Sequence, residues 1–373
     1  MMHKFTLLLF GMASVVTLHA QSLDLVELCT LPSEVSETSG LENGPNKWFW
    51  THNDSGNPAE LYCIDTLGVI QRTVKVVGDV NIDWEELAKD DDGNLYIGNF
   101  GNNALNRTDL RIVKIPSVDT CTGTTYVTDT IRLSYADQTD FPPVAANGNF
   151  DMEAMVWYND SLHLFSKDRS VPYTGYTKHY KLPEVGGDYS AQLVDSFYTG
   201  GTSYFSSITA ADFSEDNSQL VLLNADRIWL FSNYTGSNFF GGDVSEMLLG
   251  SFTQKEGVCF RHGFIYITDE DAFGIGRKMY RVHPSTFVGV DDKRTDIRVR
   301  PVYNNRLQLQ EIVADNTDEQ LEWRLLDTAG RLISNGESEN NRISKGRLNA
   351  SNGVFVIQLF YKSKPIKALL VKL

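Results

Sequence analysis

The stretch WEELAKDDDGNLYIGNF, from Trp84 to Phe100, decides the fold. It contains a short strand, a polar turn, a second apolar strand and a polar end, which is the pattern of a β-hairpin. Four other segments share this layout: TSGLENGPNKWFWTHND from Thr38, MEAMVWYNDSLHLFSKD from Met152, ITAADFSEDNSQLVLLNAD from Ile208 and KEGVCFRHGFIYITDED from Lys255. The chain is therefore predicted to be all-β and built from a repeat.

The spacing of this repeat predicts a propeller. Each of the first four segments is followed by further strand-like runs, giving about four strands in about fifty residues, the size of a propeller blade. The last segment is followed only by KMYRVH, whereas the run LDLVELCTLP from Leu23 belongs to no repeat. Pairing this spare strand with the last unit would remove an open sheet edge. We expect a five-bladed β-propeller over residues 22–290, or six blades if an irregular blade lies between Asn103 and Asn149.

A second domain is expected after Val290. The run DDKRTD reads as a linker, and residues 291–373 contain short alternating strands that predict a small Ig-like β-sandwich. The runs LEWRLLDTAGRLI, GRLNASNGVFVIQLF and KPIKALLVKL resemble the type A C-terminal sorting domain of the type IX secretion system of Bacteroidetes. This resemblance implies that the secretion machinery is a partner and that the protein reaches the outer-membrane surface or the medium.

The N-terminus also indicates export. Residues 1–20 carry Lys4 before an apolar run and end in the small residue Ala20, the pattern of a signal peptide that directs a protein to the periplasm. No later apolar run is long enough to predict a transmembrane segment. The runs THNDSGNPAELYCID, DWEELAKDDDGNLYIGNFGNN and DMEAMVW resemble a group of exported bacterial propeller proteins, which agrees with this fold and location.

The net charge and the cysteine content limit the partners and metal sites that are expected for this protein. The net charge of −15 excludes nucleic acid as a partner and leaves carboxylates available to hold divalent cations. The four cysteines show neither CxxC spacing nor a histidine cluster, so a zinc site is not expected. Their three disulfide connectivities stay open, although Cys63 and Cys259 lie in apolar runs and are predicted to be buried free thiols.

The repeat places two columns of residues in register. Alignment at the first strand of each unit gives Ser39, Glu85, Glu153, Thr209 and Glu256. Alignment at the end of the second strand gives His52, Asn99, Lys167, Asn224 and Asp269. Because the two strands are antiparallel, the start of one lies beside the end of the other. Both columns are therefore expected at one end of the central channel, here called the channel mouth.

The carboxylate and amide oxygens of these two columns are hard ligands, which suit Ca²⁺ or Mg²⁺. The predicted metal ligands are Glu85, Glu153, Glu256, Asn99, Asn224 and Asp269. The predicted ligand-binding residues are His52, Lys167, Asp168 and Arg169. The structural alternative is that each glutamate caps the entry to its strand and that the asparagines form turns. The acids of DDDGN are expected in a turn at the opposite end of the blade.

Two functions from different classes remain open. The first is a secreted or cell-surface propeller that binds a divalent cation and a small or extended ligand at the channel mouth. The second is a metal-dependent hydrolase, similar in architecture to propeller lactonases, in which the cation activates water and His52 is the base. The chain contains no HExxH, GxSxG, phosphate loop or dinucleotide fingerprint, so its motifs do not decide whether it is an enzyme.

Overall fold

The computed structural model describes residues 25–201, 206–249, 251–272, 274–284, 298–303, 308–315, 320–326, 332–351, 353–361 and 364–373. The predicted signal peptide (1–20) and linker (291–296) lie outside these residues. The described chain consists of strands, short 3₁₀ turns and irregular segments, so the all-β prediction is confirmed. None of the helices in the described ranges is long and apolar enough to cross a membrane.

Strand pairing divides the described residues between 25 and 284 into five antiparallel meanders. Their first strands are β2 (Thr38–Asn43), β6 (Trp84–Lys89), β11 (Asp151–Trp157), β15 (Ala210–Phe213) and β19 (Lys255–Arg261). Their second strands are β3 (Phe49–Asn53), β7 (Leu95–Asn99), β12 (Ser161–Lys167), β16 (Gln219–Leu223) and β20 (Phe264–Asp269). Their third strands are β4 (Glu60–Ile64), β8 (Arg111–Ile115), β13 (Tyr176–Pro183), β17 (Arg227–Ser232) and β21 (Lys278–Val282).

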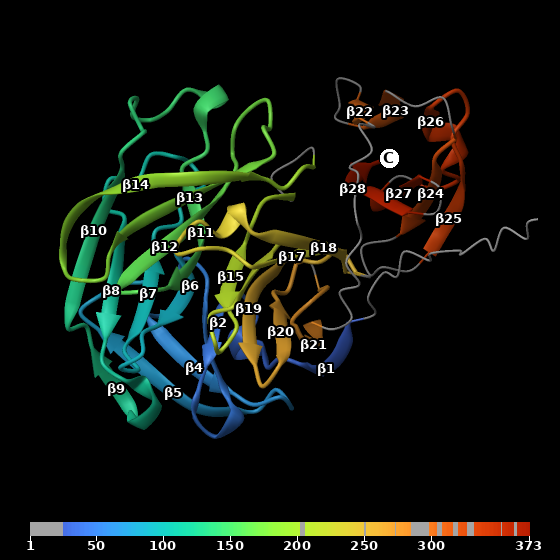
Figure 1. Ribbon diagram of the computed structural model, residues 1–373. Helices are drawn as coiled ribbons and strands as arrows, with labels where there is room; N and C mark the ends of the chain where they lie inside the picture. The colour runs from blue at the N-terminus through green and yellow to red at the C-terminus, as the bar shows by residue number, and fades with distance from the viewer. Residues whose placement is uncertain are drawn as a thin grey trace, which may run out of the picture.

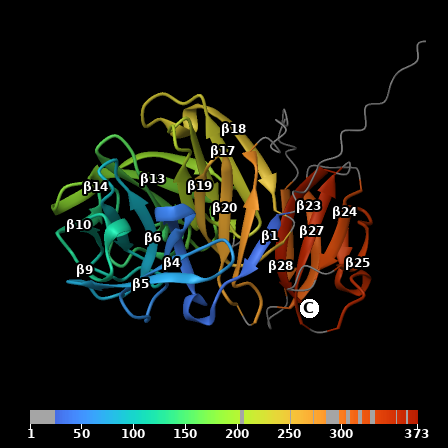
Figure 2. The same ribbon diagram turned by 90° about the horizontal axis from the view of Figure 1, so that it is seen from below.

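The outer strands complete and connect these sheets. They are β5 (Ile70–Val77), β10 (Asp129–Tyr135), β14 (Gly187–Tyr198), β18 (Asp243–Leu248) and, in the last meander, β1 (Val26–Thr30). The strand β1 pairs with β21, so the spare N-terminal strand does complete the last unit (Figures 1 and 2). The strand β9 (Gly123–Tyr126) adds to β5 in parallel, and a parallel pairing of β10 with β14 joins the second and third meanders.

The five first strands form a closed ring. β2 contacts β6, β6 contacts β11, β11 contacts β15, β15 contacts β19, and β19 returns to β2 (Figure 1). Hydrophobic clusters fill the space between successive meanders; Trp50 and Trp84, for example, share one cluster, and Tyr96 and Tyr180 share the next. The remaining three junctions have clusters of the same kind. Burying each such large side chain contributes about 1.5 to 3 kcal/mol, so the ring is held by side-chain packing between sheets.

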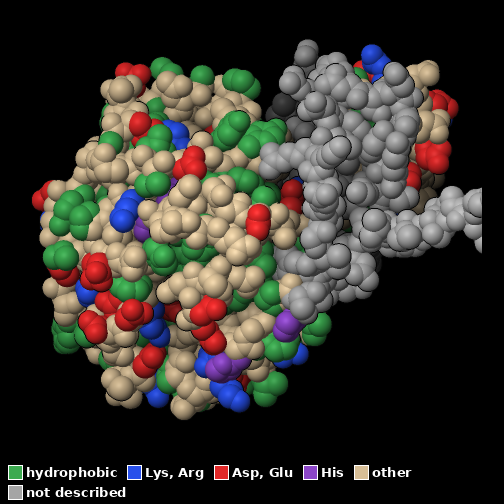
Figure 3. Space-filling model, viewed as in Figure 1, with side chains coloured by type: hydrophobic (Ala, Val, Ile, Leu, Met, Phe, Trp, Pro, Cys, Tyr) green, Lys and Arg blue, Asp and Glu red, His purple; other side chains and the backbone are tan. Residues whose placement is uncertain are grey.

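The placement of the cysteines follows the sequence expectation, and the acidic side chains are spread over the surface. All four cysteines are free thiols, and Cys63 and Cys259 are buried, which confirms that prediction. Acidic side chains lie at many places over the face shown in Figure 3, with Lys and Arg side chains among them. The negative charge of the chain is therefore spread over the surface seen there.

The C-terminal residues form two further sheets. One contains β22 (Arg298–Tyr303), β23 (Leu309–Asp315) and β26 (Arg342–Ser344). The other contains β25 (Leu332–Glu337), β24 (Glu322–Leu326), β27 (Val354–Tyr361) and β28 (Lys364–Lys372). A separate hydrophobic cluster, which includes Trp323 and Ile343, joins residues of both sheets.

Candidate functional site

A β-bulge lies near the start of the first strand in four meanders, and in three of these the unpaired residue is a glutamate. The pairing of β6 with β7 skips Glu85, that of β11 with β12 skips Glu153, and that of β19 with β20 skips Glu256. A bulge leaves one residue unpaired and re-aims its side chain. The three glutamates aligned by sequence therefore share one local geometry, and all three are buried.

These glutamates belong to a larger set of carboxylates, here called the acidic mouth. Its members are Asp54, Asp83, Glu85, Asp151, Glu153, Glu256 and Glu270. They come from four of the five meanders. The sequence did not single out Asp54, Asp83, Asp151 or Glu270, although each lies within two residues of a position in the aligned columns.

Two groups within the acidic mouth have metal-ligand spacing. Asp54, Asp83 and Glu85 each offer a carboxylate oxygen, and these oxygens lie within 4.8 Å of one another. Asp54, Glu256 and Glu270 form a second group with the same property. Asp54 belongs to both, so it links the carboxylates of β6 with those of β19 and β20.

Basic side chains neutralise one side of the acidic mouth. The Lys167 Nζ lies 3.0 Å from the Glu153 Oε1, and the Arg169 Nη2 lies 3.2 Å from the same oxygen. The Arg169 Nε also lies 2.6 Å from the Asp151 Oδ2. Within the described ranges, neither Glu85 nor Glu256 forms an ion pair. The unneutralised charge is thus concentrated in the two groups that share Asp54.

The pKa values reflect this imbalance. Burial, followed by repulsion from Glu153 and Asp54, raises the pKa of Glu85 well above its usual range. Burial and then Glu270 raise the pKa of Glu256 in the same way. Burial, followed by repulsion from Asp54, raises the pKa of Glu270 to about 8. Burial also raises the pKa of Asp54 to about 6.

The pKa of Lys167 is also raised, because the same carboxylates attract its positive charge. Burial alone would lower the pKa of Lys167, but Glu153, Glu256 and Glu85 outweigh burial and raise it. The lysine is therefore a fixed positive charge in the folded protein. It serves as a counter-ion for Glu153 and not as a proton acceptor.

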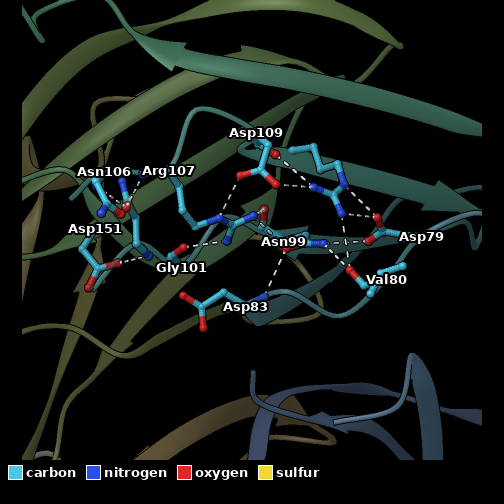
Figure 4. Close-up of polar contacts among 11 residues, drawn as sticks. Asp79, Val80, Asp83, Asn99, Gly101, Asn106, Arg107, Asp109 and Asp151 are labelled. Atoms are coloured by element: carbon cyan, nitrogen blue, oxygen red, sulfur yellow. Dashed lines mark hydrogen bonds and ion pairs between the residues drawn. The ribbon is translucent and has the colours of Figure 1, made fainter. Parts of the chain in front are cut away.

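Asn99, the predicted metal ligand at the end of β7, holds a loop in place through hydrogen bonds. The Asn99 Nδ2 donates to the Asp79 Oδ2 at 2.9 Å and to the Val80 carbonyl at 2.8 Å. The Asn99 Oδ1 accepts from the Asp83 N–H at 3.3 Å and from Arg107 at 3.1 Å (Figure 4). The side chain of Asn99 is therefore engaged on both its oxygen and its nitrogen.

Asn224 and Asp269 have comparable structural partners. The Asn224 Oδ1 accepts the backbone N–H groups of Asp226 and Arg227, at 3.0 and 2.8 Å. One oxygen of Asp269 accepts the Lys278 N–H at 2.7 Å and the other accepts the Tyr280 hydroxyl at 2.9 Å. The structure thus divides the predicted columns: the glutamates lie in the acidic mouth with Lys167 beside Glu153, whereas Asn99, Asn224 and Asp269 fasten the next strand or loop.

The remaining predicted ligand residues, His52 and Asp168, are fully buried. The ring of His52 packs edge-on against Trp84, and its Nδ1 lies 3.0 Å from the Asn53 carbonyl oxygen. Burial lowers the pKa of His52 to about 4. Asp168 accepts the backbone N–H groups of Ser170, Thr174 and Gly175, so it shapes the loop that follows β12.

A glycine completes the wall of the acidic mouth. A Cβ atom at Gly101 would lie 2.0 Å from the Glu85 Oε1 and 2.6 Å from the Asp83 Oδ2. The Gly101 N–H also donates to the Asp83 carbonyl at 3.2 Å. Only a residue without a side chain leaves Glu85 and Asp83 where they are.

Comparison with known proteins gives distant structural similarities. No protein-family model matches the chain, and no curated protein matches it. A PQQ-bound aldose sugar dehydrogenase from Streptomyces coelicolor is 13% identical with a TM-score of 0.40, over 71% of this chain and 98% of that one. PorZ, a surface component of the type IX secretion system of Porphyromonas gingivalis, is 12% identical with a TM-score of 0.32, over 90% of this chain and 44% of PorZ. A streptogramin B lyase is 13% identical with a TM-score of 0.36, over 93% and 97% of the two chains. Similarities this distant do not identify a ligand or an activity.

Proposed function

We propose that this protein is an exported β-propeller that binds a divalent cation at its acidic mouth. One observation carries the proposal. Two groups of three carboxylates share Asp54, and within each group the offered oxygens lie within 4.8 Å of one another. Among the described residues, no basic side chain forms an ion pair with Glu85 or Glu256. Ionised carboxylates held this close repel one another. A bound cation would remove that repulsion.

The finer architecture is part of the same proposal. We infer five blades, because five meanders are paired in order and their first strands contact one another in a closed ring. Residues 291–373 would be the Ig-like sorting domain that engages the type IX secretion machinery, which two sheets around one core support. A signal peptide at residues 1–20 would bring the chain to the periplasm first.

The donor set favours Ca²⁺ over Mg²⁺. The oxygens that the two groups offer all come from carboxylates, which Ca²⁺ accepts in flexible arrangements of six to eight ligands. Mg²⁺ requires nearly ideal octahedral geometry and keeps several waters. Positions on the cation not taken by the protein would be open to oxygen atoms of a small or extended ligand, beside the charges of Lys167 and Arg169.

The hydrolase alternative receives no specific support. Its predicted base, His52, is fully buried against Trp84 and belongs to neither carboxylate group. We therefore propose cation and ligand binding, not hydrolysis, as the function of this site.

The test is calcium titration of chelator-treated protein by calorimetry, with Mg²⁺ as a second titrant. We expect Ca²⁺ to bind more tightly than Mg²⁺ and to raise the melting temperature. Glu85→Gln and Glu256→Gln should each weaken Ca²⁺ binding at least about tenfold, which is about 1.4 kcal/mol. Glu215→Gln is the matched control, because the Glu215 side chain is 57% exposed and lies in the turn between β15 and β16. Absence of any heat and of any change in melting temperature with either ion would refute the proposal.

A further inference from the structure

A cavity of about 580 Å³ lies outside the acidic mouth. Its walls come from the segments between β10 and β11 and between β12 and β13, together with the start of β13 and Ser196 on β14. Six of its lining residues carry the argument: Asp137, Thr139, Asp140, Phe150, Tyr176 and Lys178. The volume is in the range of small-molecule sites in proteins.

Hydrogen bonds join the two walls to each other. The Val171 N–H donates to the Ala145 carbonyl at 2.8 Å, and the Arg169 N–H donates to the Gly148 carbonyl at 3.1 Å. The Asn149 Nδ2 donates to the Tyr176 carbonyl at 2.8 Å. Because the walls are fastened across the cavity, a ligand would find its site already formed and would lose little affinity to loop ordering.

The charges of the lining exclude an anionic ligand. Asp137 and Asp140 contribute two carboxylates, and Lys178 is the one basic residue among the lining residues. The Lys178 Nζ already lies 2.6 Å from the Asp137 Oδ2 and 3.9 Å from the centre of the Phe150 ring. A phosphate or carboxylate ligand would therefore meet an unneutralised Asp140 without an available cation.

The rest of the lining suits a ligand rich in hydroxyl groups. Its uncharged polar side chains are those of Thr139, Asn147, Asn149, Ser170, Thr174 and Ser196. Hydroxyl and amide groups both donate and accept hydrogen bonds, and a carboxylate accepts two or more. A ligand that carries many groups able to donate and accept hydrogen bonds therefore fits this lining better than an apolar ligand does.

Aromatic surface is exposed at the same place. Tyr176 lines the cavity and is 44% exposed, and its ring lies 5.0 Å from that of Tyr198. An aromatic ring offers a flat apolar face beside a polar hydroxyl. The C–H face of a sugar ring can cover such a face while its hydroxyl groups bond to the polar wall.

We propose that this cavity binds a neutral saccharide, with a sugar ring on Tyr176 and hydroxyl groups directed toward Asp140 and the neighbouring amides and hydroxyls. This site goes beyond the proposed cation function. It needs no metal, because its lining shares no residue with the acidic mouth.

A glycan array followed by calorimetry tests the proposal. The probes are neutral oligosaccharides of glucose, mannose, galactose and N-acetylglucosamine, an oligogalacturonate, and an uncharged peptide. We expect a neutral oligosaccharide to bind equally well with and without chelator. Failure of every neutral glycan, preference for the oligogalacturonate or the peptide, or loss of saccharide binding in chelator would each overturn the proposal.

Variants locate the saccharide. Tyr176→Ala should weaken binding at least about tenfold, whereas Tyr176→Phe should keep it because the ring remains. Thr139→Trp, at an exposed position of the lining, should obstruct the cavity and weaken binding while leaving the melting temperature unchanged. Tyr126→Ala is the control, since Tyr126 is 64% exposed and lies on β9, outside the cavity. Undiminished binding by both Tyr176→Ala and Thr139→Trp would refute the location.

Discussion

Asp54→Asn tests the acidic mouth most directly, because Asp54 belongs to both carboxylate groups. The substitution keeps the size of the side chain and leaves an oxygen that can still accept the Ser55 N–H. It replaces a carboxylate ligand by a neutral amide and so removes one negative charge. These two changes have opposite consequences for stability, according to whether a cation is present.

The magnitudes follow from the geometry. Two full charges at the 4.8 Å limit repel by about 3.5 kcal/mol at an effective dielectric constant of about 20. Partial protonation of the neighbours reduces the relief, so in chelator at pH 8 we expect Asp54→Asn to raise the free energy of unfolding by about 1 to 3 kcal/mol. At a Ca²⁺ concentration one hundred times its Kd, the wild type should gain about 2.7 kcal/mol. That gain corresponds to about 5 to 10 °C in melting temperature for a domain of this size, and Asp54→Asn should lose most of it.

The raised pKa values also determine the direction in which folding stability changes with pH. A carboxyl whose folded pKa is raised binds its proton more tightly when folded, so its contribution to stability is lost as pH rises from its ordinary pKa to the raised one. For Glu270 this window runs from 4.5 to about 8, and for Asp54 from 3.8 to about 6. Without cation the wild type should therefore lose stability over this range, and Asp54→Asn should lose less. With Ca²⁺ the gain in melting temperature should increase over the same range, since the cation displaces protons.

Differential scanning calorimetry at pH 5, 6, 7 and 8, in chelator and in Ca²⁺, measures both effects. The advantage of Asp54→Asn over the wild type in chelator should shrink or reverse when Ca²⁺ is added at pH 8. Asp188→Asn, on a side chain that is 82% exposed, controls for the loss of one negative charge. If Asp54→Asn is the less stable protein in chelator and still responds fully to Ca²⁺, the reasoning from charge repulsion is wrong.

Three further predictions follow from the same contacts. Gly101→Ala should displace Glu85 and at least halve the Ca²⁺-induced rise in melting temperature, because its Cβ would lie 2.0 Å from the carboxylate. Asn99→Ala should lower the free energy of unfolding by about 2 to 4 kcal/mol, since several hydrogen bonds worth about 1 kcal/mol each are lost; its Ca²⁺ affinity by calorimetry should not change. Deletion of residues 22–31 should leave β21 with an unpaired edge, and light scattering should detect association that full-length protein lacks.

Each of these has an outcome that contradicts it. Gly346→Ala, where an added Cβ meets nothing within 4 Å, is the control for the glycine variant, and equal Ca²⁺ responses of the two variants would contradict the role of Gly101. A large loss of Ca²⁺ affinity in Asn99→Ala would indicate that Asn99 is a metal ligand. A truncated chain that stays monomeric and melts like the full chain would show that β1 is dispensable.

The sequence predicted the ring because the repeat is carried by strands and turns, whose pattern is local. It also aligned Glu85, Glu153 and Glu256 correctly, since each opens a first strand at the same bulge. It could not show which way the strand-end residues turn. An asparagine such as Asn99 can face the channel or fasten a loop, and that choice depends on partners about twenty residues away in sequence, such as Asp79.

The register of single residues was also beyond the sequence. Lys167 was aligned with Asn99, but the residue that pairs immediately before the bulge of β11 is Ser166, opposite Met152. Lys167 lies one position further on, opposite Asp151, from where it reaches Glu153. One residue of slip changes the direction of a side chain in a strand, and bulges shift register without an obvious signal in composition. Asp54 and Glu270 escaped attention for the same reason, because each follows an aligned position by one or two residues.

The two sides of the acidic mouth suggest a last prediction, about Glu153. This glutamate was expected to bind metal, yet Lys167 and Arg169 already neutralise it. Lys167 is also attracted by Glu256 and Glu85, which raise its pKa together with Glu153. In Glu153→Gln the ammonium would lose its nearest partner and turn to the other two carboxylates, where it would compete with a cation.

We therefore expect Glu153→Gln to weaken Ca²⁺ binding about tenfold, or about 1.4 kcal/mol, although Glu153 is not a ligand. Adding Lys167→Met removes the competitor, so the double variant should regain the wild-type Kd in calorimetry. If Glu153 is itself a ligand, the double variant should bind as weakly as Glu153→Gln or more weakly. The comparison thus decides whether Glu153 holds the cation or instead keeps Lys167 away from the carboxylates that do.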